Sequence, residues 1–322
     1  MPERVLVTGA TGFVGSHVAQ AFAEAGYEVR VGARASSNLR WISGLDAESV
    51  PLDVIRGRPE DVSRAVENVD VVVHAAGITR ARRSEDYYSV NAGGTRRVAA
   101  AALRAGARRF VLISSLAARG PDGHDHPESD YGRSKLEAET HLLALGGRME
   151  TVVLRPAAIY GPRDTDLLPL FRMARAGWLL VPSGAGPLQP VYAEDVARAA
   201  LAAAREPVGF GPFPVAENRR YAWRDVAAGL EKSLGRTVRA VRLPAGAFVL
   251  AGRAAEWATK PLSAVPIFDE RRARDLALNA WTCDVSGTGE ALGWRAEVSL
   301  FEGLERTARW YGQVGWLSMK PL

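Results

Sequence analysis

Tyr131 and Lys135 are four residues apart, which places them one turn apart on the same face of a helix. A free phenol has a pKa of about 10, so it exchanges protons poorly at neutral pH. A neighbouring ammonium favours the phenolate and lowers that pKa. Tyr131 could then serve as a general acid or base for a carbonyl or hydroxyl group. Such pairs also arise by chance on helices, so this one needs independent support.

Ser115 supplies that support. It follows the apolar run 110–113, at the carboxyl end of a predicted strand. Ligands of open α/β sheets bind at this edge, where a hydroxyl could bond the substrate oxygen that Tyr131 protonates. A plain cap or turn serine is the alternative, and it suits Ser114 better, although sequence separates the two poorly.

A glycine-rich turn spans residues 8–15, directly after the apolar run 5–7. Gly9 permits a tight turn, Gly12 lets the backbone approach a pyrophosphate, and Gly15 lets the next helix pack closely on the strand. The N–H groups and positive dipole end of that helix attract phosphates. With a strand before it and a helix after it, the turn predicts a dinucleotide site.

Composition is that of an ordinary globular protein, with 47% hydrophobic and 24% charged residues in 322. The net charge of +5 comes from scattered arginines, which predicts no nucleic-acid partner but favours an anionic ligand. The single Cys283 excludes an internal disulfide framework and a Cys-rich metal site. The chain is long enough for one large domain or two modest ones.

We expect neither a targeting segment nor a membrane partner. The first strand begins by Arg4, which leaves no room for a cleavable signal peptide. The longest uncharged stretch, 177–193, contains three prolines and three glycines and cannot form a membrane helix. These features predict a cytoplasmic location and a small-molecule substrate.

Apolar runs alternate with helical patterns through the first half of the chain. Strands are predicted at 28–32, 49–52, 69–74, 110–113 and 151–154, and helices at about 13–25, 59–67, 87–105 and 130–145. This alternation with right-handed crossovers predicts an α/β fold, a doubly wound parallel sheet of the Rossmann type.

The sequence changes character after Pro156, where glycines and prolines cluster and several tryptophans follow. The strand-like run 190–192 and the helix 194–205 are expected to return to the main sheet. We predict a dinucleotide-binding domain at 1–162, joined by 188–206, and a smaller C-terminal substrate-covering domain from 163–187 and 207–322.

Taken in order, the motifs resemble those of the extended short-chain dehydrogenase/reductase family, in the group called NAD-dependent epimerase/dehydratase. The matching segments are 8–15, Asp53, 74–77, 91–95, 114–115, 131–135, 155–156, 160–162, 191–196, 292–294 and 310–311. The resemblance therefore covers essentially the whole chain, and it specifies the family better than the substrate.

The resemblance implies a catalytic triad of Ser115, Tyr131 and Lys135. Lys135 would also hold the nicotinamide ribose, and Asp53 the adenine amino group. Asn91 would either join a proton relay or brace the sheet by a structural hydrogen bond. The implied cofactor contacts are Gly9, Thr11, Gly12, Phe13, Val14, Arg34, Asp53, Val54, Ala75, Ala76, Gly77, Asn91, Tyr131, Lys135 and Pro156.

The chain departs from the family where the second strand ends. Relatives often place a carboxylate there for the ribose 2′-OH, but the segment 31–38 has none. Arg34 is instead placed for a 2′-phosphate, with Ser36 and Ser37 as further donors, which favours NADP over NAD. An arginine stacked on adenine would suit either cofactor.

Three other segments bear on the reaction. Leu116 and Ala117 replace the Asp-Glu pair of sugar-nucleotide 4,6-dehydratases, so dehydration by that route is not expected. Residues 157–159 lack the asparagine common in sugar-nucleotide enzymes, which weakens the case for such a substrate. His124 and His126 flank Asp125, but two imidazoles in a short loop are usually solvated, and we predict no metal.

We therefore predict an NAD(P)-dependent oxidoreductase, similar to the dihydroflavonol-reductase-like and hydroxysteroid-dehydrogenase-like members. It would pass a hydride between nicotinamide and a secondary alcohol or ketone, with Tyr131 moving the proton. A nucleotide-sugar 4-epimerase with tightly held NAD is the alternative. A non-catalytic nucleotide sensor is disfavoured because it needs no proton-transfer residues.

A homodimer is also expected. The helices 87–105 and 130–145 match the pair through which relatives form a four-helix interface. Small residues at 99–102 would permit close approach, although a helix packed on its own sheet looks the same.

The missing carboxylate generates a first prediction. Arg34→Ala should weaken NADP(H) binding by about 10- to 150-fold, since a charge-assisted phosphate contact contributes roughly 1.5–3 kcal/mol. NAD(H) affinity should stay nearly unchanged in parallel titrations. Equal losses for both cofactors would contradict the phosphate role.

Overall fold

The computed structural model describes residues 2–121, 123–145, 147–205, 208–244, 246–247, 249–250, 253 and 281–318. Its chain divides into two compact units. The first comprises Met1–Ala157, Ala193–Val215 and Asp284–Arg295, and the second Ala158–Tyr192, Ala216–Cys283 and Ala296–Leu322. The part of the predicted substrate-covering domain at 254–280 lies outside the described residues.

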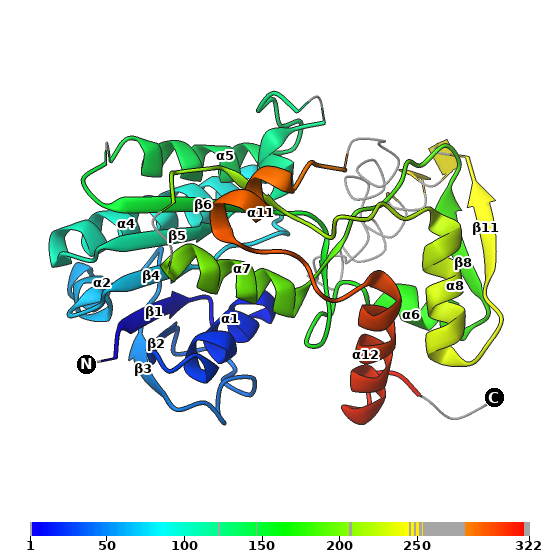
Figure 1. Ribbon diagram of the computed structural model, residues 1–322, viewed down its shortest axis with the longest axis horizontal. Helices are drawn as coiled ribbons and strands as arrows, with labels where there is room; N and C mark the ends of the chain where they lie inside the picture. The colour runs from blue at the N-terminus through cyan, green and yellow to red at the C-terminus, as the bar shows by residue number, and fades with distance from the viewer. Residues whose placement is uncertain are drawn as a thin grey trace. The chain divides into compact units, whose positions relative to one another are not determined.

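A seven-stranded parallel sheet forms the centre of the first unit, in the order β10-β6-β5-β4-β1-β2-β3 (Figure 1). Its strands are β1 (Arg4–Thr8), β2 (Glu28–Ala33), β3 (Ala47–Pro51), β4 (Val71–His74), β5 (Arg109–Ile113), β6 (Glu150–Pro156) and β10 (Phe213–Val215). The strand order reverses between β1 and β4, as in a doubly wound sheet. The predicted fold class is confirmed.

Helices cover both faces of this sheet (Figure 1). They are α1 (Phe13–Glu24), α2 (Pro59–Val66), α4 (Gly94–Ala105), α5 (Asp130–Leu143), α7 (Ala193–Arg205) and the short α11 (Ser286–Leu292). On one face α1 packs against α7, and on the other α4 packs against α2 and α5. Because both faces are covered, the central strands are apolar throughout, and Val5, Leu6 and Val7 have no exposed surface.

The helix expected over 87–105 is interrupted. It consists of α3 (Ser84–Tyr87), a π-helical turn η1 (Tyr88–Gly93) and α4. A π-turn is rare, and it occurs often at functional sites. Here it holds Asn91, which is buried. Within α4, Ala99, Ala101 and Ala102 pack into the chain's own core, so they do not support the homodimer, which stays a prediction.

The run 190–192 does not return to the main sheet. β9 (Val191–Tyr192) pairs with β7 (Ile159–Tyr160) in a two-stranded sheet of the second unit. The strand that joins the main sheet is β10, which pairs with β6. β10 contains Pro214, which an edge strand tolerates because one of its sides makes no ladder bonds. Pro214 and the neighbouring glycines interrupt the apolar run by which a strand would be predicted. The helix α7 does pack on β5 and β6, as expected.

The second unit has its own core. β8 (Trp178–Pro182) pairs in parallel with β11 (Arg239–Leu243), and the helices are α6 (Leu168–Arg175), α8 (Trp223–Leu234) and α12 (Leu300–Gln313). Its core combines aliphatic side chains with large buried aromatic ones, including Phe171, Tyr192, Tyr221 and Tyr311. α8 approaches α12 closely, since a Cβ on Gly229 would lie 2.6 Å from Leu304 Cδ1. Among the described residues, no helix combines the length and apolar character needed to span a bilayer.

The close approach of Gly15 to the turn before it generates a stability prediction. A Cβ at Gly15 would lie 2.2 Å from the Gly9 carbonyl oxygen, so Gly15→Ala must displace backbone. We expect a loss of about 1–3 kcal/mol or more in the free energy of unfolding, measured by urea denaturation. The control is Gly287→Ala, where a Cβ meets open space. It should change stability by less than about 1 kcal/mol.

Candidate active site

The turn between β1 and α1 brings several backbone segments together. Gly9 has φ +71°, and a Cβ on it would lie 2.7 Å from the Ala76 nitrogen. The Gly12 N–H donates to the Gly9 carbonyl at 2.9 Å. Gly12 is also the N-cap of α1 and has no side chain to cover the first N–H groups of the helix. This end of α1 is therefore suited to bind phosphate. Gly15 packs the helix on the turn rather than on the body of the strand.

Thr8 and His74 join the carboxyl ends of β1 and β4. Thr8 Oγ1 lies 2.8 Å from His74 Nδ1 and accepts a hydrogen bond from the Ala76 N–H at 3.2 Å. Burial, reinforced by the charge of Lys135, lowers the pKa of His74 from 6.5 to about 3. The imidazole is therefore neutral, and the Thr8 hydroxyl beside it holds Ala76 in the segment 75–77, to which the resemblance assigns cofactor binding. The resemblance implies no separate role for His74.

Lys135 projects into the interior of the first unit. Its Nζ donates to the Ile113 carbonyl at 2.7 Å, and only 5% of the residue is exposed. Burial lowers the pKa of Lys135 to about 8, against the opposing effect of the Glu139 carboxylate. The ammonium thus bonds β5 two residues before Ser115, one turn along α5 from Tyr131.

Tyr131 is oriented by the way α5 begins. Ser129 caps the helix, its Oγ accepting from the Gly132 N–H at 3.1 Å. A Cβ on Gly132 would lie 2.5 Å from the Ala117 carbonyl oxygen, so the helix start packs tightly on η2 (Leu116–Arg119). The Tyr131 ring also makes an edge-to-face contact with Tyr87, with centroids 6.2 Å apart.

The structure gives the two neighbouring serines different hydrogen-bond partners. Ser115 is the cap of η2, because its Oγ accepts from the Ala117 N–H at 3.2 Å. Ser114 donates its hydroxyl to Glu139. The prediction that Ser114 is the better cap was wrong, because the partner that decides it lies on another helix. Ser115 can still donate, since a hydroxyl that accepts one bond retains its hydrogen.

Asn91 braces three segments. Its Nδ2 donates to the Ile78 carbonyl at 3.1 Å and to Ser134 Oγ at 3.0 Å. Its Oδ1 accepts from the Ile78 N–H at 2.9 Å. Both amide hydrogens are used in these bonds, which tie η1 to α5 and to the loop after β4. This geometry fits the structural role expected for Asn91, in which its hydrogen bonds hold neighbouring segments together.

Arg34 follows β2 and Asp53 follows β3, and these two strands are neighbours in the sheet. Arg34 is exposed, and its turn is closed by a bond from its N–H to Ser37 Oγ at 3.1 Å. Asp53 Oδ1 accepts from the N–H groups of Ile55 and Arg56 at 2.8 and 2.9 Å. Burial alone would raise the pKa of Asp53, but these bonds and the charges of Arg34 and Arg56 lower it. Val54 packs beside Gly94, where a Cβ would lie 2.9 Å from Val54 Cγ2.

The loop with His124 and His126 is organised by a different contact. Asp125 pairs with Arg155, whose Nη1 lies 2.6 Å from Asp125 Oδ1. Both histidines are exposed. In the described part of the chain, no group of three or more His, Cys, Asp or Glu residues is arranged to hold a metal.

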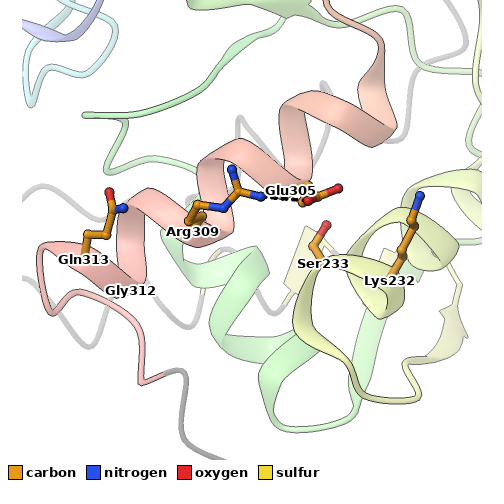
Figure 2. Close-up of a pocket in the computed structure, with 6 residues that line it drawn as sticks. All are labelled: Lys232, Ser233, Glu305, Arg309, Gly312 and Gln313. Carbon is orange, nitrogen blue, oxygen red and sulfur yellow. Dashed lines mark hydrogen bonds and ion pairs between the residues drawn. The ribbon is translucent and has the colours of Figure 1, made fainter.

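A separate hollow of about 570 Å³ lies between α8 and α12 (Figure 2). It is lined by Lys232, Ser233, Glu305, Arg309, Gly312 and Gln313. The Glu305–Arg309 pair, 2.8 Å apart, lies along α12, and none of the six residues is buried. No residue with a predicted chemical role lines it, so the candidate site remains in the first unit.

Comparison with known proteins identifies the family. The sequence model of the NAD dependent epimerase/dehydratase family matches residues 5–214. A ceramide reductase from Caulobacter vibrioides is 34% identical over 97% of this chain and 96% of its own. A UDP-glucose 4-epimerase from Vibrio cholerae is 27% identical over 98% and 97%. The chain belongs to the NAD-dependent epimerase/dehydratase family, as its motifs indicated.

Solved structures with the same fold include another epimerase. A Bacillus cereus UDP-glucuronic acid 4-epimerase solved with NAD superimposes with a TM-score of 0.76 over 97% of this chain and 99% of that one, at 21% identity. This chain therefore shares the fold of an epimerase that was solved with NAD.

Neutral His74 generates a pH prediction. Between about pH 6.5 and 3 the unfolded chain binds a proton at this imidazole that the folded chain does not. Stability from His74 is therefore complete above pH 6.5 and falls as the pH decreases, by roughly 1.4 kcal/mol per unit. Between pH 7 and pH 5, the free energy of unfolding should decrease by about 2 kcal/mol less in His74→Gln than in the parent. Parallel urea titrations measure this difference, and equal slopes would contradict it.

Proposed function

We propose that the protein is an NAD(P)-dependent reductase that interconverts a ketone and a secondary alcohol. The observation that carries this proposal is the buried Lys135, whose ammonium bonds β5 beside Ser115 and lies one turn from Tyr131. A protein that only binds nucleotide has no need to bury an ammonium next to a phenol. Desolvating such a charge is costly, so its presence supports a catalytic role.

The residues around the glycine turn fit a dinucleotide. Gly9, Gly12 and the N-terminus of α1 would hold the diphosphate, with Thr11, Phe13 and Val14 in the same turn and Ala75–Gly77 beside it. Asp53, Val54 and Arg34 would hold the adenosine end, and Lys135 the nicotinamide ribose near Asn91 and Pro156. When bound, the cofactor supplies or accepts the hydride. We propose NADP as the preferred form, because Arg34 supplies a cation where a 2′-phosphate would lie.

The protein's own residues would manage the proton. In the reductive direction Tyr131 donates its phenolic hydrogen to the substrate carbonyl oxygen, and Ser115 donates a hydrogen bond to the same oxygen. The positive charge of Lys135 stabilises the phenolate that forms. In the oxidative direction the phenolate takes the proton back from the alcohol.

The similarity to a ceramide reductase over nearly the whole chain supports a long-chain keto-amide as substrate class. The second candidate is nucleotide-sugar 4-epimerisation, which the similarity to a UDP-glucose 4-epimerase supports. The two differ in net redox chemistry. A reductase consumes a reduced nicotinamide cofactor stoichiometrically, whereas an epimerase retains NAD and shows no net change.

The test is a paired assay with NADPH and NADH on a keto-ceramide and on UDP-glucose. Stoichiometric cofactor oxidation with the keto-amide supports the reductase. Conversion of UDP-glucose to UDP-galactose without net cofactor change would replace it by the epimerase. Mass spectrometry of the nucleotide that copurifies identifies the bound form directly.

Tyr131→Phe provides the mechanistic prediction. It removes one oxygen and keeps the ring, so fold and cofactor affinity should change by less than about 1 kcal/mol. Turnover should fall by about 10²- to 10⁴-fold, the usual contribution of a general acid or base. Fluorescence titration measures affinity, and the assay above measures turnover.

Two further variants bracket this result. Lys135→Met should impair both turnover and cofactor binding, because its ammonium serves the phenol and the ribose together. Tyr27→Phe removes the same oxygen from a ring packed on Phe22 and should change neither. If Tyr131→Phe turned over at the parent rate, the proton-transfer mechanism would be wrong.

A further inference from the structure

Glu139 is a buried carboxylate one helical turn beyond Lys135, and the residue is only 4% exposed. Arg155 Nε donates to its two oxygens at 3.0 and 3.2 Å, and Arg155 Nη2 donates to Oε2 at 2.6 Å. Ser114 donates its hydroxyl to Oε1. Of these two donors to the carboxylate, Ser114 precedes the predicted catalytic residue Ser115, and Arg155 precedes Pro156, an implied cofactor contact.

These contacts join the elements that carry the site. Ser114 lies at the end of β5 beside Ser115, and Arg155 lies on β6 beside Pro156. Glu139 itself is on α5 with Tyr131 and Lys135. Arg155 also reaches Asp125 in the loop between Ser115 and Tyr131, at 2.6 Å. The cluster of Ser114, Asp125, Glu139 and Arg155 is thus a continuous polar network behind Lys135.

Among the described residues, few charged or titratable groups lie around the Lys135 ammonium. On α5 these are Tyr131 one turn before it and Glu139 one turn after it. From β4 comes His74, which is neutral, and from β5 the Ile113 carbonyl oxygen. From η1, the side chain beside it is the uncharged Asn91. Arg155 on β6 stands behind Glu139. Glu139 is therefore an anion that opposes the cost of burying Lys135.

We propose that Glu139 is a positioning residue that keeps Lys135 protonated and in place, with Arg155 setting how much negative charge Lys135 experiences. This inference rests on the proposed function, since it concerns the lysine that would serve Tyr131 and the ribose. A buried ion pair by itself is weak evidence for stability, so the role of this one is argued from its placement beside Lys135.

The two partners should then act on Lys135 in opposite directions. Glu139→Gln removes the nearby anion and leaves Arg155 as a like charge, which lowers the pKa of Lys135. Arg155→Met removes a like charge and strips Glu139 of its main cation, which raises that pKa. A nearby opposite charge commonly shifts a pKa by one unit or more, so the shift in Glu139→Gln should be about one pH unit. The shift in Arg155→Met should have the opposite sign. A role confined to packing predicts no such opposition.

The small number of lysines makes the titration of Lys135 measurable on the intact protein. The chain has lysines only at 135, 232, 260 and 320, so ¹³Cε-labelled lysine gives four signals. Lys135→Arg identifies the signal of interest by its loss. In the parent this signal should titrate near pH 8, well below an ordinary lysine. The matched control is Glu137→Gln, which changes an exposed carboxylate on the same helix.

The expected result is a lower titration midpoint in Glu139→Gln, a higher one in Arg155→Met and an unchanged one in Glu137→Gln. Glu139→Asp retains the charge and should restore a midpoint close to that of the parent. Each of the first two variants tests the proposal alone, should the other fail to fold. A folded Glu139→Gln or Arg155→Met with the parent midpoint would overturn it, as would shifts of the same sign.

Turnover adds a second readout. If the ammonium form is required, the alkaline limb of the kcat profile should move to lower pH in Glu139→Gln by about one unit, and to higher pH in Arg155→Met. The two proposals fail separately. An inactive parent contradicts the proposed reaction but leaves the lysine titration interpretable. An active parent with an unshifted lysine contradicts only the role of Glu139.

Discussion

Lys135 carries an ammonium into the interior of a parallel sheet protein, and the surrounding residues are arranged to accommodate it. The Ile113 carbonyl accepts its hydrogen bond, so the chain at the end of β5 must hold that oxygen toward α5. Glu139 lies one turn away and is itself held by Arg155 and Ser114. His74 stays neutral because its ring is buried, and the charge of Lys135 adds to that effect. The buried ammonium thus interacts with groups from β4, β5 and α5.

A second constraint is the absence of side chains where backbones meet. Gly9 approaches the segment after β4, Gly15 approaches the turn itself, and Gly132 approaches η2. The first two leave the N-terminal end of α1 free for an anion. The third sets where α5 starts, and so where Tyr131 stands relative to Ser115. These close approaches place the glycine turn and the start of α5 at the same carboxyl edge of the sheet.

The proposed reaction draws on both features. The relatives include a ceramide reductase and a UDP-glucose 4-epimerase, so membership of the family does not by itself specify the substrate. The similarity to a ceramide reductase and the missing asparagine at 157–159 both favour the reductase. The charge on Lys135 matters equally for either reaction, because each one passes through a ketone or alkoxide oxygen.

The sequence by itself indicated the parallel sheet apart from β10, the main helices around it, and the placement of Tyr131 and Lys135 on one helix face, because periodicity, glycine spacing and a four-residue helical interval are local properties. Tertiary structure decided the rest. Ser115 caps η2, whereas Ser114 donates to Glu139, which lies 25 residues along the chain. Asn91 became a brace because a π-turn aims it at Ile78 and Ser134. Tertiary structure also decided that β10 pairs in the main sheet and that β9 pairs with β7. The sequence does not indicate these partners, because β10 contains Pro214 and β9 has only two residues. Buried polar groups bond to whatever the fold brings near, and a sequence read locally does not contain that information.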